Sequence, residues 1–196
     1  VKDAIVRLGG GCCTAEIVSD QGLVLTNHHC AYDLIQNHSS VEKDYLTNGF
    51  WAMTRAEELP NPGLTASTLV RMEDITKRMN DSLQGVAENQ RSAVIARVGK
   101  IITDEIAKEK KGYQGDVRAI FYGNQFILSV YMVYKDVRLV GAPPSSVGKF
   151  GGDTDNWMWP RHTGDFSVLR IYTGPDGEAA EYDSLRNIPL KPNRYL

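Results

Sequence analysis

Short apolar runs separated by turn residues dominate the opening of the chain. They predict β-strands at residues 4–8, 14–19 and 23–27. The last two are separated by Asp20-Gln21-Gly22, a sequence that favours a tight turn, so we expect an antiparallel hairpin. His29 and Cys30 then follow directly at the end of the second hairpin strand.

Further strands are expected after the loop signal Pro60-Asn61-Pro62-Gly63. Their residues are rich in threonine, valine and aromatic side chains, which favour strands. The predicted segments are 65–72, 117–122, 125–134, 137–140 and 166–172.

The periodicity changes between about residues 74 and 111. Apolar residues there recur at intervals of three and four with charges between them, which is the pattern of an amphipathic helix. These residues are Ile75, Met79, Leu83, Val86, Val94, Val98, Ile101 or Ile102, and Ile106. The segment predicts one or two helices inserted into a mainly β protein, with Gly85 and Gly99 as candidate breaks.

The composition is that of a soluble globular protein. The 196 residues are 42% hydrophobic and 23% charged, with a formal charge of −2, which argues against nucleic acid as a partner. No apolar run reaches the roughly 18 residues of a membrane-spanning helix. Because the chain starts without methionine and stops at Leu196 after a proline-spaced segment, we expect residues 1–196 to be a fragment without a second complete domain.

Three cysteines allow one disulfide and one leftover thiol. Cys12 and Cys13 are consecutive and point to opposite faces of a strand, so only one of them can face a partner strand. We favour the pair Cys13 and Cys30, which would place the protein in an oxidising compartment. The alternative is three reduced cysteines in a cytosolic core.

His29 is the candidate general base of an acyl-transfer site, while His28 is expected to point elsewhere and to be structural. Such a site also needs a carboxylate that orients the base and a nucleophile. Asp165, between a glycine and an apolar strand, is the candidate carboxylate; as an alternative it initiates the strand. No serine has a Gly-x-Ser-Gly setting, so a serine nucleophile is expected beyond Leu196.

The glycine- and aspartate-rich segment 151–157 contains Asn156 next to Trp157. An amide and an indole can together bind a cationic amine; the alternative is a turn anchored by tryptophan. A zinc site formed from the cysteines and histidines near residues 12–30 is the competing use of those side chains. Their spacing argues against it, because neighbouring strand residues face opposite ways, and we expect no metal and no other cofactor.

As a set, these motifs resemble the bacterial dipeptidyl peptidases seven and eleven over essentially the whole chain. The shared segments are Gly9-Gly10-Gly11, Cys13-Thr14-Ala15-Glu16, Ser19-Asp20-Gln21-Gly22-Leu23, Thr26-Asn27-His28-His29-Cys30, and the stretch from Pro143-Pro144-Ser145-Ser146 through Trp159-Pro160-Arg161-His162-Thr163-Gly164-Asp165-Phe166-Ser167. Cys12 is an additional cysteine beside the motif position.

The resemblance implies a chymotrypsin-like double β-barrel that carries a helical domain, of which this chain would be the N-terminal part of the peptidase domain. It implies release of dipeptides from the free N-terminus of peptides, in the periplasm or at the surface of a Gram-negative bacterium. His29 and Asp165 match the family's catalytic histidine and aspartate. Asn156 matches the residue that binds the substrate's N-terminal ammonium, with Trp157 in the same site. The complete protein is a possible homodimer.

Two other functions compete with this interpretation. A trypsin-like or HtrA-like endopeptidase would share the histidine segment without needing an amine-binding loop. A non-catalytic peptide-binding module would keep the barrel and lack the chemistry. The isolated chain is expected to be inactive in every case, because it lacks a nucleophile.

Overall fold

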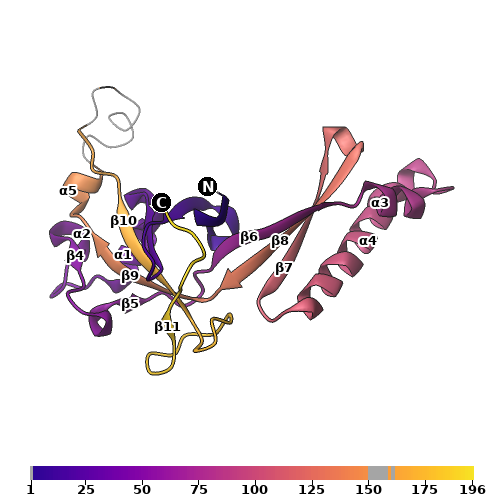
Figure 1. The fold of residues 1–196 in the computed structure, drawn as a ribbon. Coiled ribbons are helices and arrows are strands. Elements are labelled where there is room, and N and C mark those ends of the chain that lie inside the picture. The colour runs from indigo at the N-terminus through magenta and orange to yellow at the C-terminus, as the bar shows by residue number, and fades with distance from the viewer. Residues whose placement is uncertain (1, 150–158, 160–161) are drawn as a thin grey trace. The chain divides into compact units, whose positions relative to one another are not determined.

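The computed structural model describes residues 2–149, 159 and 162–196, which form two compact units. Unit 1 comprises residues 1–67 and 134–196, and unit 2 comprises residues 68–133. Many of the helices and strands of each unit are labelled in Figure 1. None of the helices in the described ranges is long and apolar enough to cross a membrane.

Unit 1 is built on an antiparallel sheet with the strand order β1-β2-β3-β10-β9-β4. The strands are β1 (Ile5–Leu8), β2 (Cys13–Ile17), β3 (Leu23–Thr26), β10 (Ser167–Thr173), β9 (Asp136–Ala142) and β4 (Phe50–Trp51). Two short strands extend it, β5 (Leu59–Pro60) on β9 and β11 (Ile188–Pro189) on β10. The order of the described strands is an open path, so the sheet is not closed.

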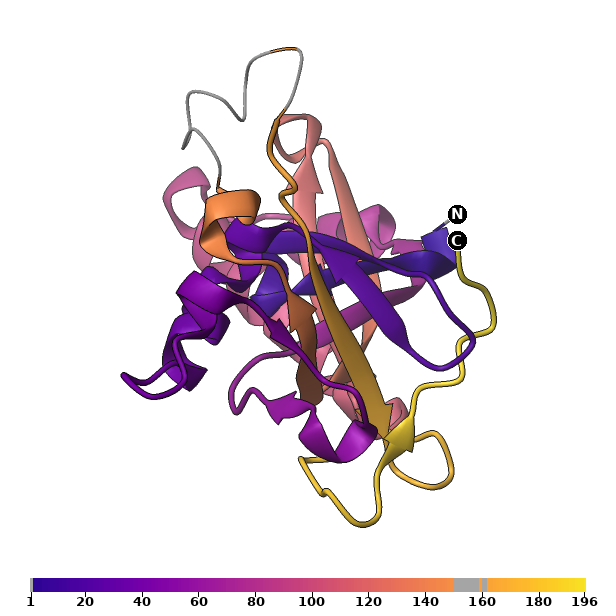
Figure 2. The same cartoon turned by 90° about the vertical axis from the view of Figure 1, so that its left-hand side faces the viewer.

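The predicted hairpin joins β2 to β3, and both strands are seen in Figure 2. The hydroxyl oxygen of Ser19 accepts hydrogen bonds from the amides of Gln21 and Leu23. Gly22 has a φ of +69°, and a side chain there would meet the carbonyl oxygen of Ile171 at 2.8 Å. The turn therefore requires glycine for its conformation and for the close approach of β10.

Unit 1 also contains three α-helices and three 3₁₀ turns among its described residues. They are α1 (His28–His38), α2 (Tyr45–Asn48) and α5 (Ser145–Gly148), with 3₁₀ turns η1 (Lys2–Ala4), η2 (Gly9–Gly11) and η3 (Arg55–Glu57). The placement of His29 at a strand end is wrong, since β3 stops at Thr26 and His28 begins α1. His28, Ala31 and Ile35 are buried at helical spacing, and this apolar face stabilises the helix.

Unit 2 packs two helices on a three-stranded antiparallel sheet. The strand order is β6 (Ala66–Asp74), β8 (Gln125–Tyr134), β7 (Tyr113–Ile120), and a 3₁₀ turn η4 (Phe121–Gly123) connects β7 to β8. The helices are α3 (Thr76–Leu83) and α4 (Glu88–Glu109), both inside the segment whose periodicity predicts helices. Gly85, at φ +70°, lies between them, whereas α4 continues through Gly99.

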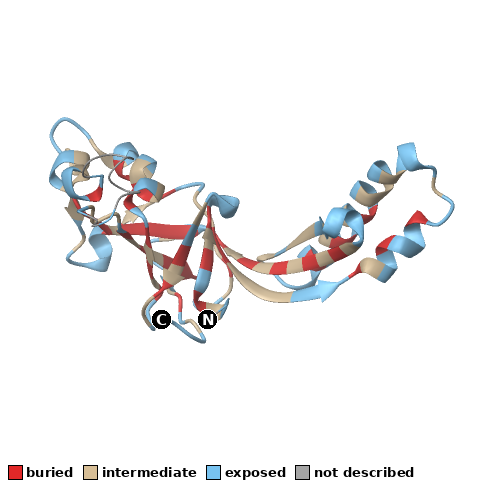
Figure 3. Cartoon of the chain, turned by 90° about the horizontal axis from the view of Figure 1, so that it is seen from above, coloured by how far each residue is buried: buried red, intermediate tan, exposed pale blue. Residues whose placement is uncertain are grey.

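The core of unit 2 follows the two periodicities of its elements. Alternate residues of β8 are buried, which is visible as red and tan bands in Figure 3, and each helix contributes residues three or four positions apart. The buried residues are Ile75, Met79, Leu83, Val98, Ile102, Ile106, Phe126, Leu128 and Val130. The mainly β fold with a helical insertion is thus confirmed.

A buried ion pair lies along strand β9, opposite the end of β10. The Arg138 guanidinium donates to both carboxylate oxygens of Asp136, at 2.9 and 2.7 Å, and lies 3.7 Å from the ring centre of Tyr172. The Tyr172 hydroxyl donates to the buried Glu58. Burial, with this hydrogen bond, raises the pKa of Tyr172 to about 12.

We expect Arg138→Ala to destabilise the protein by about 3–5 kcal/mol, because it leaves the Asp136 charge buried without its partner. The matched control is Lys135→Ala, which removes an exposed ion pair with Glu181 and should cost less than about 1 kcal/mol. Urea unfolding followed by tryptophan fluorescence measures both. Equal effects of the two substitutions would contradict a stabilising role for the buried pair.

Candidate active site

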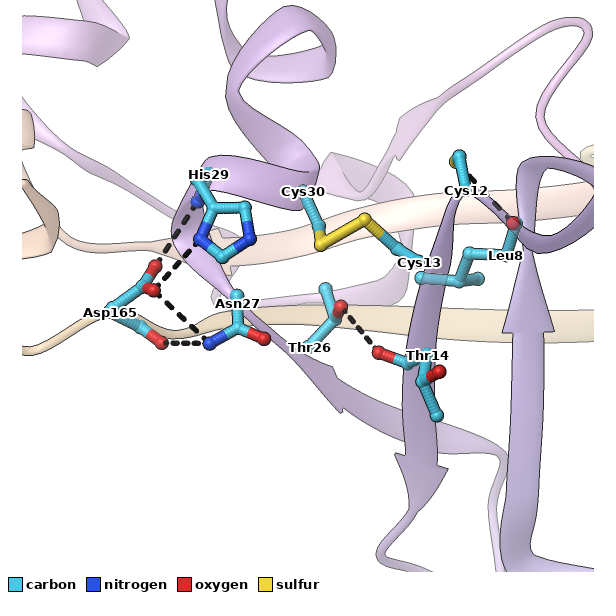
Figure 4. Close-up of a disulfide and its surroundings, with 9 residues drawn as sticks. All are labelled: Leu8, Cys12, Cys13, Thr14, Thr26, Asn27, His29, Cys30 and Asp165. Carbon is cyan, nitrogen blue, oxygen red and sulfur yellow. Dashed lines mark hydrogen bonds and ion pairs between the residues drawn. A yellow bond between two sulfur atoms is a disulfide. The ribbon is translucent and has the colours of Figure 1, made fainter. Parts of the chain in front are cut away.

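The candidate site lies at the junction between the end of β3 and the start of α1. Thr26 is the last residue of β3, and its hydroxyl donates to the carbonyl of Thr14 on β2. Asn27 has an extended backbone and directly precedes the helix. His29 is therefore in the first turn of α1, with its ring facing Asp165 (Figure 4).

Asp165 lies two residues before the first residue of β10, and the pairing of β10 with β3 brings it to His29. Ser167 pairs with Thr26, so the two chain segments leave the sheet side by side. Nδ1 of His29 lies 2.9 Å from Oδ2 of Asp165. The side chain of Asp165 is 11% exposed and that of His29 is 60% exposed.

The Asp165 carboxylate also binds the N-terminus of α1. Its Oδ1 accepts a hydrogen bond of 3.1 Å from the amide of His29, and its Oδ2 accepts one of 3.1 Å from Nδ2 of Asn27. The first amides of a helix have no partner inside the helix, and its dipole attracts an anion. Asp165 therefore caps a helix and orients a histidine with one carboxylate.

The pKa of Asp165 reflects this balance. Burial by itself raises the pKa, but the hydrogen bonds from His29, the His29 charge and the amide of His28 outweigh it, and the pKa is lowered from 3.8. Asp165 is consequently ionised at neutral pH. A proton on Nδ1 of His29 can be donated to it, which leaves Nε2 as the ring nitrogen that can accept a proton.

His28 and His29 have opposite surroundings although they are adjacent. His28 is 1% exposed, and burial lowers its pKa from 6.5. The expectation that His28 points away from His29 agrees with this burial. Asn156 and Trp157, the residues expected to bind a substrate amine, lie outside the described residues. Within the described ranges, no group of three or more His, Cys, Asp or Glu side chains is arranged to hold a metal ion.

A disulfide joins the start of β2 to the first turn of α1. The sulfur atoms of Cys13 and Cys30 are bonded, across a sequence separation of 17 residues. Cys12 is exposed and carries a free thiol, which donates to the carbonyl of Leu8 in Figure 4. The cross-link therefore holds the residue after His29 against the neighbouring strand.

Sequence reasoning found His29 and Asp165 but missed two partners of that pair. These are Asn27 and the helical amides of residues 28 and 29. The burial spacing of His28, Ala31 and Ile35 is the signal that could have revealed the helix.

A histidine held by a partly buried carboxylate at the end of an antiparallel sheet resembles the pairing of base and orienting carboxylate in acyl-transfer hydrolases. The family model for peptidase S46 matches residues 1–196. The chain belongs to the peptidase S46 family.

Two kinds of dipeptidyl-peptidase are among the relatives that match the whole chain. It is 50% identical to the Asp/Glu-specific dipeptidyl-peptidase of Flavobacterium psychrophilum and 49% identical to dipeptidyl-peptidase 7 of Phocaeicola vulgatus. Each match covers 100% of this chain and 27% or 28% of the relative. The chain thus spans little more than a quarter of the length of these relatives.

Solved structures agree with the fold. The crystal structure of Porphyromonas endodontalis DPP11 in complex with substrate matches with a TM-score of 0.89 at 44% identity. That match covers 100% of this chain and 29% of the crystallised chain. The crystal structure of the same protein in an alternate conformation matches with a TM-score of 0.84 at 45% identity.

We expect replacement of both Cys13 and Cys30 by serine to destabilise the protein by about 3 kcal/mol, as the chain-entropy estimate gives for a loop of this size. Cys12→Ser is the matched control, and as an exposed substitution it should stay within about 0.5 kcal/mol. Thermal unfolding with and without a reducing agent measures the effect. A loss of stability in Cys12→Ser as large as that in the double variant would instead point to Cys12 as the partner of Cys30.

We expect Asp165→Asn to destabilise the protein at neutral pH, and the difference from the wild type to narrow in acid. The folded pKa of Asp165 is below that of the unfolded chain. Ionised Asp165 therefore stabilises the fold above the unfolded value, near 3.8, and this contribution is lost as the pH falls through the folded pKa. Urea unfolding of both proteins from pH 7 to pH 3 tests it; a difference independent of pH would contradict it.

Proposed function

We propose that the complete protein is a serine-type dipeptidyl peptidase that releases dipeptides from the free N-terminus of peptides. The observation that carries the proposal is the contact of His29 with the partly buried Asp165, in a chain of the peptidase S46 family. Both relatives are named dipeptidyl-peptidases, and we propose only the release of dipeptides that these names have in common.

His29 would act as the general base. With Nδ1 donating to Asp165, Nε2 would take the proton of the attacking serine and return it to the leaving amine. Asp165 would hold the imidazole in this tautomer and stabilise its charged form. The greater exposure of His29 supports this, because a base must reach both nucleophile and substrate.

The nucleophilic serine would come from sequence outside residues 1–196. No serine of the chain has a Gly-x-Ser-Gly setting, and the matched relatives are several times longer than this chain. Residues 1–196 would then supply the base and its orienting carboxylate, as the N-terminal part of the peptidase domain with a helical insertion at about 74–111.

Asn156 would bind the substrate's N-terminal ammonium, with Trp157 as an aromatic neighbour. A fixed distance between this group and His29 would limit the product to two residues. The proposal for Asn156 and Trp157 rests on the family resemblance of their segment.

We propose an oxidising location, the periplasm or cell surface of a Gram-negative bacterium. The bond between Cys13 and Cys30 supports it, because disulfides persist in oxidising compartments. A homodimer of the complete protein stays a prediction.

The test uses the full-length protein with peptides that differ only at the N-terminus. We expect release of dipeptides from peptides with a free amine and no release from their N-acetylated forms. His29→Ala should lower kcat at least about 1,000-fold, since it removes the base. His38→Ala, at the other end of α1, is the matched control and should keep full activity.

Asn156→Ala separates this activity from that of an endopeptidase. We expect it to raise KM for peptides with a free amine and to leave the fold intact by circular dichroism. Cleavage of free and acetylated peptides at equal rates, in the wild type and in Asn156→Ala, would contradict an exopeptidase and favour an endopeptidase.

A further inference from the structure

His28 is a buried histidine for which the proposed mechanism has no use. It is 1% exposed, although it is adjacent to a side chain that is 60% exposed. Histidine is rarely so fully buried unless its polar atoms are satisfied. Among the described residues, neither ring nitrogen makes a hydrogen bond of ordinary geometry, although the carbonyl of Pro143 is close enough to act on the pKa of the ring.

The ring of His28 is fixed by packing against two residues. It lies on the backbone of Gly148, the last residue of α5, because a methyl group at Gly148 would be 2.3 Å from Cδ2 of the ring. Tyr32, one turn further along α1, also meets the ring edge-on, with the ring centres 6.3 Å apart at 63°. The imidazole therefore fills the space between α1 and α5.

The imidazole of His28 is uncharged at neutral pH, because its pKa is lowered. Burial lowers its pKa, and the charges of His29 and Lys149 act in the same direction. The Asp165 charge and the carbonyl of Pro143 act in the opposite direction and do not outweigh burial. The shape of the ring, and not a charge, is what His28 contributes to the contact with Gly148.

The position of His28 is coupled to the contact between His29 and Asp165 through the first turn of α1. The amide of His28 acts on the Asp165 carboxylate, the amide of His29 donates to Oδ1, and Nδ1 of His29 is 2.9 Å from Oδ2. All three groups belong to two consecutive residues. A shift of the His28 ring would rotate this turn and move all of them relative to Asp165.

We propose that His28 is a positioning residue: its ring, seated on Gly148, sets the first turn of α1 so that His29 and the helical amides converge on Asp165. The kinetic consequences of this role rest on the proposed peptidase function. The geometric consequence, the hydrogen bond between His29 and Asp165, does not.

The test compares four variants of the full-length protein. His28→Ala removes the ring, Gly148→Ala displaces it, and His28→Phe keeps an aromatic ring without the nitrogens. His38→Ala, a histidine at the end of the same helix, is the control. Two quantities are measured: the low-field proton resonance of the His29 to Asp165 hydrogen bond, and kcat and KM for a dipeptide substrate.

We expect His28→Ala and Gly148→Ala to lose the low-field resonance and to lower kcat by about 10- to 100-fold with KM little changed, as for a small displacement of reacting groups. His28→Phe and His38→Ala should keep the resonance and most of kcat. Circular dichroism shows that each variant is folded at the temperature of measurement. A variant of His28 that fails to fold leaves the decision to Gly148→Ala and His28→Phe.

Retention of the resonance and of kcat in Gly148→Ala, or in a folded His28→Ala, would overturn the proposal. So would a folded His28→Phe as defective as His28→Ala, since the nitrogens would then matter more than the ring. If the wild type releases no dipeptides but the resonances follow the expected pattern, the proposed function fails and the role of His28 stands.

Discussion

The carboxylate of Asp165 is the group on which the candidate site depends. It accepts hydrogen bonds from the amide of His29 and from Asn27, and it contacts Nδ1 of His29. These contacts join positions 136 to 138 residues apart in sequence. Burial of a carboxylate is unfavourable unless its oxygens are satisfied, so the same contacts that place His29 also make the position of Asp165 tolerable.

The position of Asp165 also depends on β10, the strand that begins two residues after it. β10 is hydrogen bonded on both sides, to β3 and to β9, and Leu169 pairs with Val24 on one side and Leu139 on the other. A slip by one residue would turn Leu169 to solvent and move Asp165 away from α1. The ion pair of the buried Glu58 with Arg170, in the middle of β10, adds a contact that depends on the register of this strand.

The sequence predicts elements best where one periodicity covers the whole segment. β8 has the predicted bounds 125–134, because alternate burial and β-branched or aromatic residues agree along it. The helical segment is likewise recognised from Met79 and Leu83 in one helix and from Val98 to Ile106 in the other. In each case the information is local.

Helix α1 shows why the rest was not predicted. Its N-terminus is capped by Asp165, whereas sequence signals for a helix start rely on a capping side chain within a few residues. Asn27 stands in the capping position, yet its side chain makes no capping hydrogen bond and donates to Asp165 instead. A start signal supplied from more than 130 residues away is invisible to a local pattern.

The capping of α1 by Asp165 also gives His29 and Asp165 different surroundings. Asp165, which would stay charged in the proposed mechanism, is mostly buried and is held by backbone amides at the start of α1. His29, which would exchange a proton, has a side chain that is 60% exposed. The disulfide between Cys13 and Cys30 then holds the next residue of the turn, so the helix end is fixed from the strand side as well. Histidine, carboxylate and helix N-terminus form one unit, and its geometry is set before any nucleophile is added.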